Sequence, residues 1–547
     1  MSKNTILRGT LLLTGATFFS KFIGMIYTIP FESLVGAAGG KLYGLAYGPY
    51  SIFISLSTVG IPLAVSKFVA KYNSLGDYRT SRKMYKVALR FMLFTGLLAF
   101  LTMFFGSDLL AKLYIPSNAQ GITEADVAMV FKMISFALLV IPAMSITRGF
   151  FQGHESMGPT AISQVVEQIV RIVFLLGSVF VIIHFIDDTY ITLAVGFATF
   201  SAFIGAIASA IILFLYWRKR KPHLDRAMNQ QVKTYDFKTS TLFKELFRYA
   251  GPFVMVGLAI PLYQQIDSIT FERTLLSIGY ESSAFIDNAL SNIILYGHKL
   301  VMIPITLATG LSLATLPTLT KTFVDRNKTQ LFAQINQSLQ IIMLLIVPAV
   351  VGMSILSYEA WGAFYGVGKY IDLNGSLLRW YAPVALFFGL FTVTSSILQA
   401  INQQRYAVVS LTAGLVLKGL LNIPLMHLFG PQGAVIATLF ASVLTVILNV
   451  IRIKQSIGFS LRQLMKRTML IVIFTTITGL AVALMKWILN FWITYNDGRI
   501  ENVVILAITV TIGAGIYLTL SYASTLLERI LGGRIRIVDK LFRRKSV

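Results

Sequence analysis

The chain has 547 residues, of which 56% are hydrophobic and 13% charged, and its mean hydropathy is +0.73. This composition excludes a soluble globular protein, and the absence of cysteine from the sequence excludes disulfides, thiolate metal sites and cysteine nucleophiles. A net charge of +24 would indicate nucleic-acid binding in a soluble protein. In a membrane protein, basic cytoplasmic loops facing anionic lipids explain it better, so we expect no nucleic-acid partner.

Apolar runs of about 20 residues, the length of a membrane-spanning helix, recur along the whole chain. They predict an all-α polytopic membrane protein with about fourteen transmembrane helices. The first run resembles a signal peptide, but Lys21 interrupts it and no convincing cleavage site follows, so we expect it to remain as a helix. The expected spans are 6–33, 44–72, 84–110, 127–153, 159–185, 190–217, 246–277, 285–322, 331–356, 374–402, 404–428, 432–455, 465–491 and 501–526.

The loops between these spans alternate between basic and basic-poor. The loops poor in lysine and arginine contain Glu124, Asp126 and the pair Asp187-Asp188. The basic loops all fall on the side of the N-terminus, so the positive-inside rule predicts that both termini are cytoplasmic. These basic segments are 71–86, 218–238, 321–328, 452–467 and 534–545.

Segments of the first half recur in the second half at a nearly constant separation. Phe31-Glu32 recurs as Phe271-Glu272, 240 residues later, and Val59–Lys71 loosely resembles Thr309–Lys321, 250 residues later. The run ending at Tyr114 recurs 251 residues later. A fourth group recurs at 247 residues, with Gln152, Ser163 and Arg171 matching Gln399, Ser410 and Lys418.

This repeat predicts two six-helix lobes followed by two C-terminal helices. Because each repeat has an even number of spans, both lobes have the same orientation, and the pseudo-twofold axis lies along the membrane normal. Such an architecture is typical of alternating-access carriers with a binding site near the bilayer midplane. The expected parts are an N-lobe at 1–217, a basic cytoplasmic linker at 218–245, a C-lobe at 246–455, two further helices at 456–527 and a basic cytoplasmic tail at 528–547.

Two lysines lie deep inside apolar spans, where a cation is costly unless it faces a polar cavity or a partner. Lys21 is in the first span and Lys299 in the eighth. The alternative for each is snorkelling to the membrane surface, but both are far from the span ends. His298 points about 100° away from Lys299 on a helix and either lines the same site or packs.

Two arginines and a glutamate occupy the fourth and fifth spans. Glu167 and Arg171 are four residues apart and are expected to form a pair on one helix face. Arg148 lies near the cytoplasmic end of its span. It either anchors the helix at the interface or contacts an anionic headgroup that enters the protein.

Carboxylates inside or near the spans are fewer than the cations. Glu32 and Glu272 lie near the outer ends of their spans and are either solvated or part of a gate with Lys41 or Arg273. Asp267 is isolated in the seventh span, which favours either coupling to protons or sodium or a salt bridge to a cation such as Lys418.

The excess of cations over acids inside the membrane predicts an anionic cargo, and phosphate suits lysine and arginine. The sequence contains neither a phosphate-binding G-x-x-x-x-G-K-[ST] motif nor an H-E-x-x-H motif, and no pair of carboxylates stands on a large outer loop. We therefore expect a transporter that neither binds ATP nor acts as an enzyme.

Several motifs resemble those of the lipid II flippases of the MurJ type, in the multidrug/oligosaccharidyl-lipid/polysaccharide exporter superfamily. They are Ser20-Lys21-x-x-Gly24, Tyr296-Gly-His-Lys299 and Gly310-x-x-x-Ala314-Thr-Leu-Pro317. Lys71-Tyr-Asn73 and Gly153-x-x-x-Met-Gly-Pro159 look most similar to the YtgP branch of that family. The resemblance covers essentially the whole chain.

The resemblance implies a flippase that moves an undecaprenyl-diphosphate-linked saccharide, the peptidoglycan precursor lipid II, outward across the bacterial plasma membrane. Lys21 and Lys299 match two basic cavity positions of the family, whereas Tyr27 stands where another basic residue is expected. Arg148 and Arg171 are candidates for the missing cation. Together with His298 and Glu32 these residues form the predicted substrate-binding set. The last two helices would form a groove for the lipid tail.

The energy source and the partners are less sharply defined. The resemblance implies that Asp267, Asn422 and Thr438 match part of a sodium site, although Met426 replaces a second expected carboxylate. Sodium coupling, proton coupling and the membrane potential all remain open. No other cofactor is expected. We expect a monomer that contacts anionic lipids and the machinery of cell-wall synthesis.

Two other functions fit the same pattern. A flippase for teichoic-acid or capsular repeat units would share the fold and the cations. A cation-coupled multidrug exporter would share the fold but should have an acidic, aromatic cavity, which the two deep lysines disfavour. The short outer loops disfavour a third alternative, a membrane-bound transferase.

Overall fold

The computed structural model describes residues 3–58, 60–116, 118–186, 190–229, 231, 240–242, 244, 251 and 254–531. Within these residues the secondary structure is helical and contains no strand, so the expected all-α fold is confirmed. Asp187 and Asp188, most of 230–250 and residues 532–547 lie outside the described part of the chain. This includes much of the expected linker and most of the expected tail.

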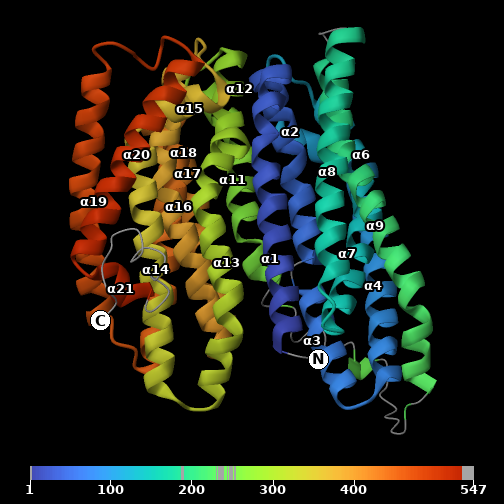
Figure 1. The fold of residues 1–547 in the computed structure, drawn as a ribbon. Coiled ribbons are helices and arrows are strands. Elements are labelled where there is room, and N and C mark those ends of the chain that lie inside the picture. Colours follow the sequence, from blue (N-terminus) through green and yellow to red (C-terminus); the bar gives the residue numbers. More distant parts are fainter. Residues whose placement is uncertain are drawn as a thin grey trace. The chain divides into compact units, whose positions relative to one another are not determined.

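The chain divides into two units, Met1–Leu295 and Tyr296–Val547. The helices of the first unit are α1 (Lys3–Ile26), α2 (Thr28–Thr58), α3 (Ile61–Ser74), α4 (Tyr78–Phe105), α5 (Ser107–Tyr114), α6 (Glu124–Ser135), α7 (Ala137–Gly153), α8 (Gly158–Val181) with a π-helical end at Ile182–Ile186, α9 (Ile191–Asn229), α11 (Ala259–Ser277) and α12 (Ser283–Ile294). Figure 1 shows α8 and α9 side by side along much of their length.

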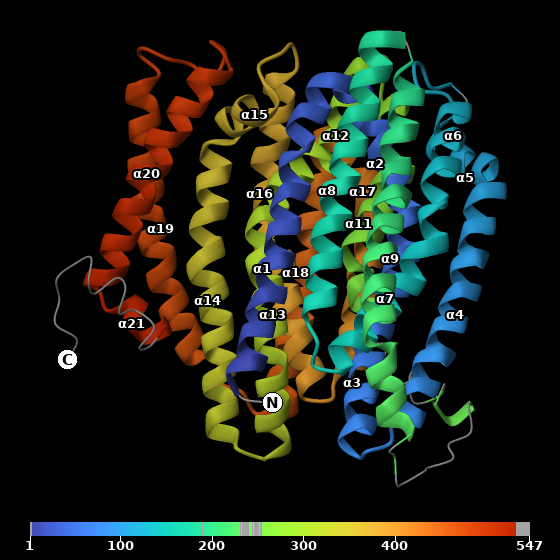
Figure 2. The same cartoon turned by 45° about the vertical axis from the view of Figure 1, so that its right-hand side comes forward.

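The helices of the second unit begin directly after Leu295. They are α13 (Tyr296–Val324), α14 (Lys328–Ile355), α15 (Ser357–Tyr365), α16 (Ile371–Ala400), α17 (Gln404–Phe429), α18 (Gln432–Ile457), α19 (Arg462–Leu489), α20 (Arg499–Ala523) and α21 (Leu526–Leu531). Figure 2 shows α19 and α20 as neighbours beside α14. Buried apolar side chains of α14, α19, α20 and α21 form one core cluster there, which includes Leu344, Ile471, Tyr517 and Ile530.

Twelve segments of the described chain are long and apolar enough to cross a membrane, which confirms a multi-pass membrane protein. They account for thirteen of the fourteen expected spans, because the 60-residue segment Gly15–Ser74 takes in the first two. The expected span at 246–277 has no counterpart among them. Part of that span, 246–250 with 252 and 253, lies outside the described residues. The described α11 begins at Ala259, and its polar residues lower its hydropathy.

The helix breaks near the N-terminus differ from the expected span ends. The expected span 6–33 contains the end of α1 and the start of α2. Within α2, Gly36 adopts a φ of 61°, where a residue with a Cβ would be strained, and the helix kinks at this point. Lys41 follows one turn after the kink. Hydropathy located the apolar runs, but it carries no information about such kinks.

The internal repeat is visible in the helix boundaries. A 28-residue helix followed by a short helix occurs twice, as α4 with α5 and as α14 with α15. Tyr78 and Lys328 begin the long helices, and Ser107 and Ser357 begin the short ones, at a separation of 250 residues in both cases. This is close to the offset of the sequence repeat.

The first part of the expected linker is helical. The α9 helix continues to Asn229, so residues 218–229 extend the sixth span beyond its expected end at 217. Arg82 explains this extension, because its guanidinium pairs with Asp225 and lies 5.3 Å from the centre of the Trp217 ring. The basic segment is thus packed against the start of α4.

Candidate functional site

Lys21 lies on α1 beside α8. The two helices approach closely, because Thr17 donates a 3.2 Å hydrogen bond to Gln164, and a Cβ at Gly24 would lie only 2.9 Å from Nε2 of Gln168. Lys21 stands between these two contacts along α1. Its side chain is exposed and forms no ion pair with any described residue. The Ser20-Lys21-x-x-Gly24 motif therefore presents an unneutralised ammonium group next to α8.

Arg171 of α8 lies among tyrosines rather than beside an acid. Its guanidinium donates to the hydroxyl of Tyr47 and, at 3.3 Å, to the hydroxyl of Tyr43, and it lies 5.3 Å from the centre of the Tyr47 ring. Tyr43 in turn shares a 2.9 Å hydrogen bond with Tyr27. The buried Nε of Arg171 has no hydrogen-bond partner among the described residues. Arg171 therefore has no carboxylate partner among the described residues.

The prediction that Glu167 pairs with Arg171 is wrong. Glu167 instead accepts a 2.7 Å hydrogen bond from Arg148 of α7. The same guanidinium donates to the hydroxyls of Ser163, at 3.0 Å, and Ser209, at 2.8 Å. A residue from another helix thus competes successfully with the partner one turn away. Glu167 neutralises the charge of Arg148. Of the two arginines considered as a further substrate-binding cation, Arg171 is therefore the better candidate.

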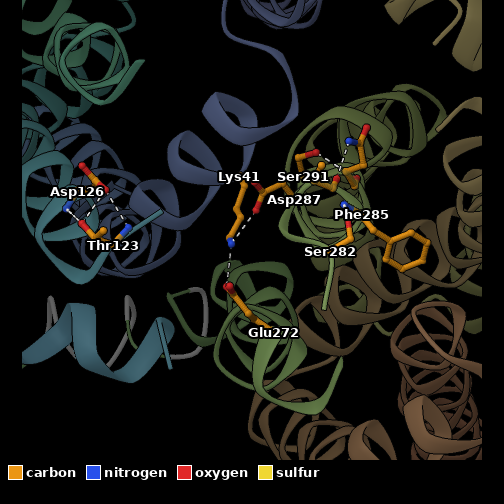
Figure 3. Close-up of polar contacts among 10 residues, drawn as sticks. Lys41, Thr123, Asp126, Glu272, Ser282, Phe285, Asp287 and Ser291 are labelled. Atoms are coloured by element: carbon orange, nitrogen blue, oxygen red, sulfur yellow. Dashed lines mark hydrogen bonds and ion pairs between the residues drawn. The ribbon is translucent and has the colours of Figure 1, made fainter. Parts of the chain in front are cut away.

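A buried ion triad connects α2, α11 and α12 (Figure 3). The ammonium group of Lys41, which is fully buried, lies 2.8 Å from a carboxylate oxygen of Glu272 and 2.8 Å from Oδ1 of Asp287. Both acids are more than nine-tenths buried. Of the two partners considered for Glu272, the structure selects Lys41, since Arg273 donates instead to the backbone carbonyl of Lys112 at 2.6 Å.

This triad has two carboxylates and one ammonium group. If all three are ionised its net charge is −1, which is costly to keep away from water. A proton on one of the carboxylates would remove the excess charge. Asp287, absent from the predicted set, was detectable as an acid within the apolar run Phe285–Leu290.

The remaining predicted residues of the first unit are placed as follows. Tyr27 is buried, and Glu32 is half-buried on α2 ahead of the kink at Gly36. Asp267 is 3% exposed on α11. Nearby, Gln265 accepts a hydrogen bond from the Tyr114 hydroxyl, so this part of α11 presents several buried polar groups.

The second unit contains the predicted pair on α13. Lys299 is half-buried, and His298 shares a 2.7 Å hydrogen bond between its Nδ1 and the hydroxyl of Tyr381 on α16. This contact packs the His298 ring against α16. The α13 and α16 helices are in extensive contact, so the hydrogen bond fixes the start of α13 against its neighbour.

Two of the three residues proposed for sodium, Asn422 and Thr438, lie in the second unit. Asn422 of α17 and Thr438 of α18 are both buried, but the Thr438 hydroxyl accepts a hydrogen bond from the fully buried ammonium group of Lys418. Met426, one turn beyond Asn422, offers no oxygen ligand. The Lys418 ammonium group therefore lies beside one of the proposed sodium ligands. A cation at this hydroxyl would be repelled by it.

The chain is similar in sequence to a known family and to several curated proteins. The family described as "Polysaccharide biosynthesis protein" matches residues 6–323. Over 532 residues the chain is 44% identical to the Lipid II flippase MurJ of Bacillus subtilis (strain 168), and the alignment covers 97% of each chain. Stage V sporulation protein B of the same organism is 23% identical over 546 residues, which is 99% of each chain.

Solved structures show the same fold. The inward closed conformation of the Lipid II flippase MurJ has a TM-score of 0.66 at 18% identity and covers 95% of this chain and 99% of that one. An inward-facing multidrug resistance MATE family transporter of the MOP superfamily has a TM-score of 0.59 at 15% identity, covering 80% and 99%. From the extent of the family match and the 44% identity, this chain belongs to the polysaccharide biosynthesis protein family and, within it, to the family of the Lipid II flippase MurJ.

Proposed function

We propose that this chain flips lipid II, the lipid-linked precursor of peptidoglycan, from the inner to the outer leaflet by alternating access. The observation that carries this proposal is the 44% identity to a lipid II flippase along 97% of both chains. The chain acts as a transporter and changes no covalent bond of its cargo.

Deep cations are the groups proposed to hold the diphosphate of the cargo. In the first unit, Lys21 and Arg171 have no carboxylate partner among the described residues. In the second unit, Lys299 lies near the start of α13. A diphosphate offers several anionic oxygens, and guanidinium and ammonium groups form short, strong hydrogen bonds with them. We propose that each of these cations contacts the diphosphate at one stage of transport.

The triad of Lys41, Glu272 and Asp287 is proposed to act as a latch that joins α2, α11 and α12. Its support is the burial of all three charges and their origin on three separate helices. A buried ion pair is stable when it is formed, and its charges must be hydrated when they separate. Such a contact could hold the three helices together and open once in each transport cycle.

The membrane potential is proposed as the energy source. An inside-negative potential favours outward movement of an anion by about 2.3 kcal/mol per charge for each 100 mV. Sodium is disfavoured at Asn422 and Thr438, because Lys418 already supplies a positive charge there. We also propose that the protein is a monomer of the bacterial plasma membrane with cytoplasmic termini, as its basic loops indicate.

The test is complementation of a bacterium whose own lipid II flippases can be depleted. Rescue of growth, with lipid II appearing at the outer leaflet, supports the proposal. If the chain fails to rescue but restores export of teichoic-acid or capsular units in a strain that lacks their flippase, the cargo is a different lipid-linked saccharide. The family description, polysaccharide biosynthesis, makes this the second candidate. Rescue of drug efflux alone would contradict both.

A further inference from the structure

A small polar pocket lies where α14, α19 and α21 meet in the second unit. Its volume is about 290 Å³, near the lower limit of ligand-binding pockets. The apolar contacts of α21 hold the pocket together, since Leu526, Leu527 and Ile530 are buried in the core cluster beside it. The polar residues that line it are Asn336, Gln337, Gln340, Gln463, Arg467 and Arg529.

The side chains of this pocket are linked in a defined arrangement. Arg467 donates at 2.6 Å to Oε1 of Gln340 and at 3.2 Å to the backbone carbonyl of Arg529. Gln337 donates at 3.0 Å to the carbonyl of Ile530. These bonds fasten α21 to α14 and α19 and bring two guanidinium groups to one pocket. The described residues contribute no acidic side chain to its lining.

Two buried polar atoms of the pocket lack a partner. Gln340 is fully buried, and its Nε2 donates no hydrogen bond to any described residue. Asn336 likewise has a buried Oδ1 that accepts none from the described chain. An unsatisfied buried amide is costly, so a ligand or water normally completes it. A ligand that satisfies both atoms needs an acceptor for Nε2 of Gln340, next to the arginines, and a donor for Oδ1 of Asn336.

We propose that this pocket binds a phosphate oxyanion. Its oxygens accept hydrogen bonds from Arg467, Arg529 and Nε2 of Gln340, and a hydroxyl of the same ligand donates to Oδ1 of Asn336. An anionic phospholipid headgroup and a soluble phosphate ester both carry this chemistry. The site is separate from the deep cations and does not depend on the proposed cargo.

Thermal unfolding of the purified full-length chain tests the site with two probes. The first is glycerol 3-phosphate in neutral detergent, compared with chloride at equal ionic strength. The second is phosphatidylglycerol in nanodiscs, compared with phosphatidylcholine. A rise in Tm with either probe supports the site. A rise with only one of them identifies the source as the soluble ester or the lipid headgroup, and a rise with both shows that the site accepts either. No rise with either probe overturns the proposal.

Variants separate the pocket from general attraction to a basic surface. Arg467→Gln should weaken the apparent affinity about tenfold or more, because it removes a charged donor. Lys466→Gln is the matched control, since it removes the same charge from the neighbouring exposed position. Gln340→Met removes the unpartnered amide without changing charge and should also weaken binding. An equal loss in Lys466→Gln and Arg467→Gln, or full binding by Gln340→Met, would overturn the proposal.

Discussion

The ammonium group of Lys41 lies 2.8 Å from Oδ1 of Asp287, although 246 residues separate them in sequence. Lys41 also pairs with Glu272, so a single buried lysine connects three helices of the first unit (Figure 3). Removing the lysine and removing one of the acids should therefore have different effects on the charge balance of the triad. Loss of Lys41 leaves two buried carboxylates together, whereas loss of one acid leaves a balanced pair.

Lys41→Met should therefore destabilise the protein far more than Asp287→Asn. Leaving buried charges unpaired costs about 3–5 kcal/mol, whereas Asp287→Asn should cost about 1 kcal/mol or less. Chemical unfolding of the purified variants measures the difference. Because the chain has no cysteine, Ser291→Cys on α12 can report opening through its rate of modification by an external thiol reagent. Equal stability of the two variants would rule out this account of the triad.

Arg171→Gln should reduce flipping about tenfold or more, because it removes a guanidinium that has no carboxylate partner among the described residues. The measure is lipid II transport at equal protein amounts. Tyr47→Phe should have a smaller effect, since it removes only one acceptor. Arg90→Gln, on the exposed face of α4, is the charge-matched control. Transport by Arg171→Gln equal to that of the control would exclude Arg171 from the site.

Arg148 and Glu167 should behave as one structural unit. Each single replacement by methionine leaves a half-buried charge unpaired, while the double replacement leaves none. We expect a coupling free energy of about 1–3 kcal/mol in a double-mutant cycle followed by unfolding. Additive effects would show that the two groups do not stabilise each other.

Sodium should have no specific effect on the wild-type protein. The Lys418 ammonium group already binds Thr438, so replacing KCl by NaCl should leave the Tm unchanged. Thr438→Val removes one acceptor of a buried charged group and should lower stability by about 1.5–3 kcal/mol. A rise in Tm with sodium, at an equal concentration of chloride, would show that a sodium site exists despite the lysine.

The sequence predicted the spans well, because hydropathy is a local property of about 20 residues. Thirteen of the fourteen expected spans correspond to apolar helices of the described chain. The breaks were predicted less well. The break between α1 and α2 and the kink at Gly36 depend on backbone conformation and packing, which hydropathy does not report.

Pairing of charges was the hardest part of the site to predict. The spacing of Glu167 and Arg171 suggested a contact within one helix, but Arg148 from α7 reaches Glu167 with support from two serines. The tyrosines around Arg171 were detectable in principle. Tyr43, Tyr47 and Tyr50 recur at the spacing of one helix face, yet such a pattern is also typical of ordinary packing.

The central claim is that cations deep in the spans hold the diphosphate of lipid II. The most direct measurement is the fraction of lipid II accessible to an externally added enzyme that cleaves it, in flippase-depleted cells that express Lys21→Ala or Lys299→Ala. Lys86→Ala, an exposed lysine of α4, is the control. We predict that both variants reach the membrane in normal amounts but leave lipid II as inaccessible as in depleted cells, while the control restores access. Wild-type accessibility in Lys21→Ala and Lys299→Ala would contradict the claim.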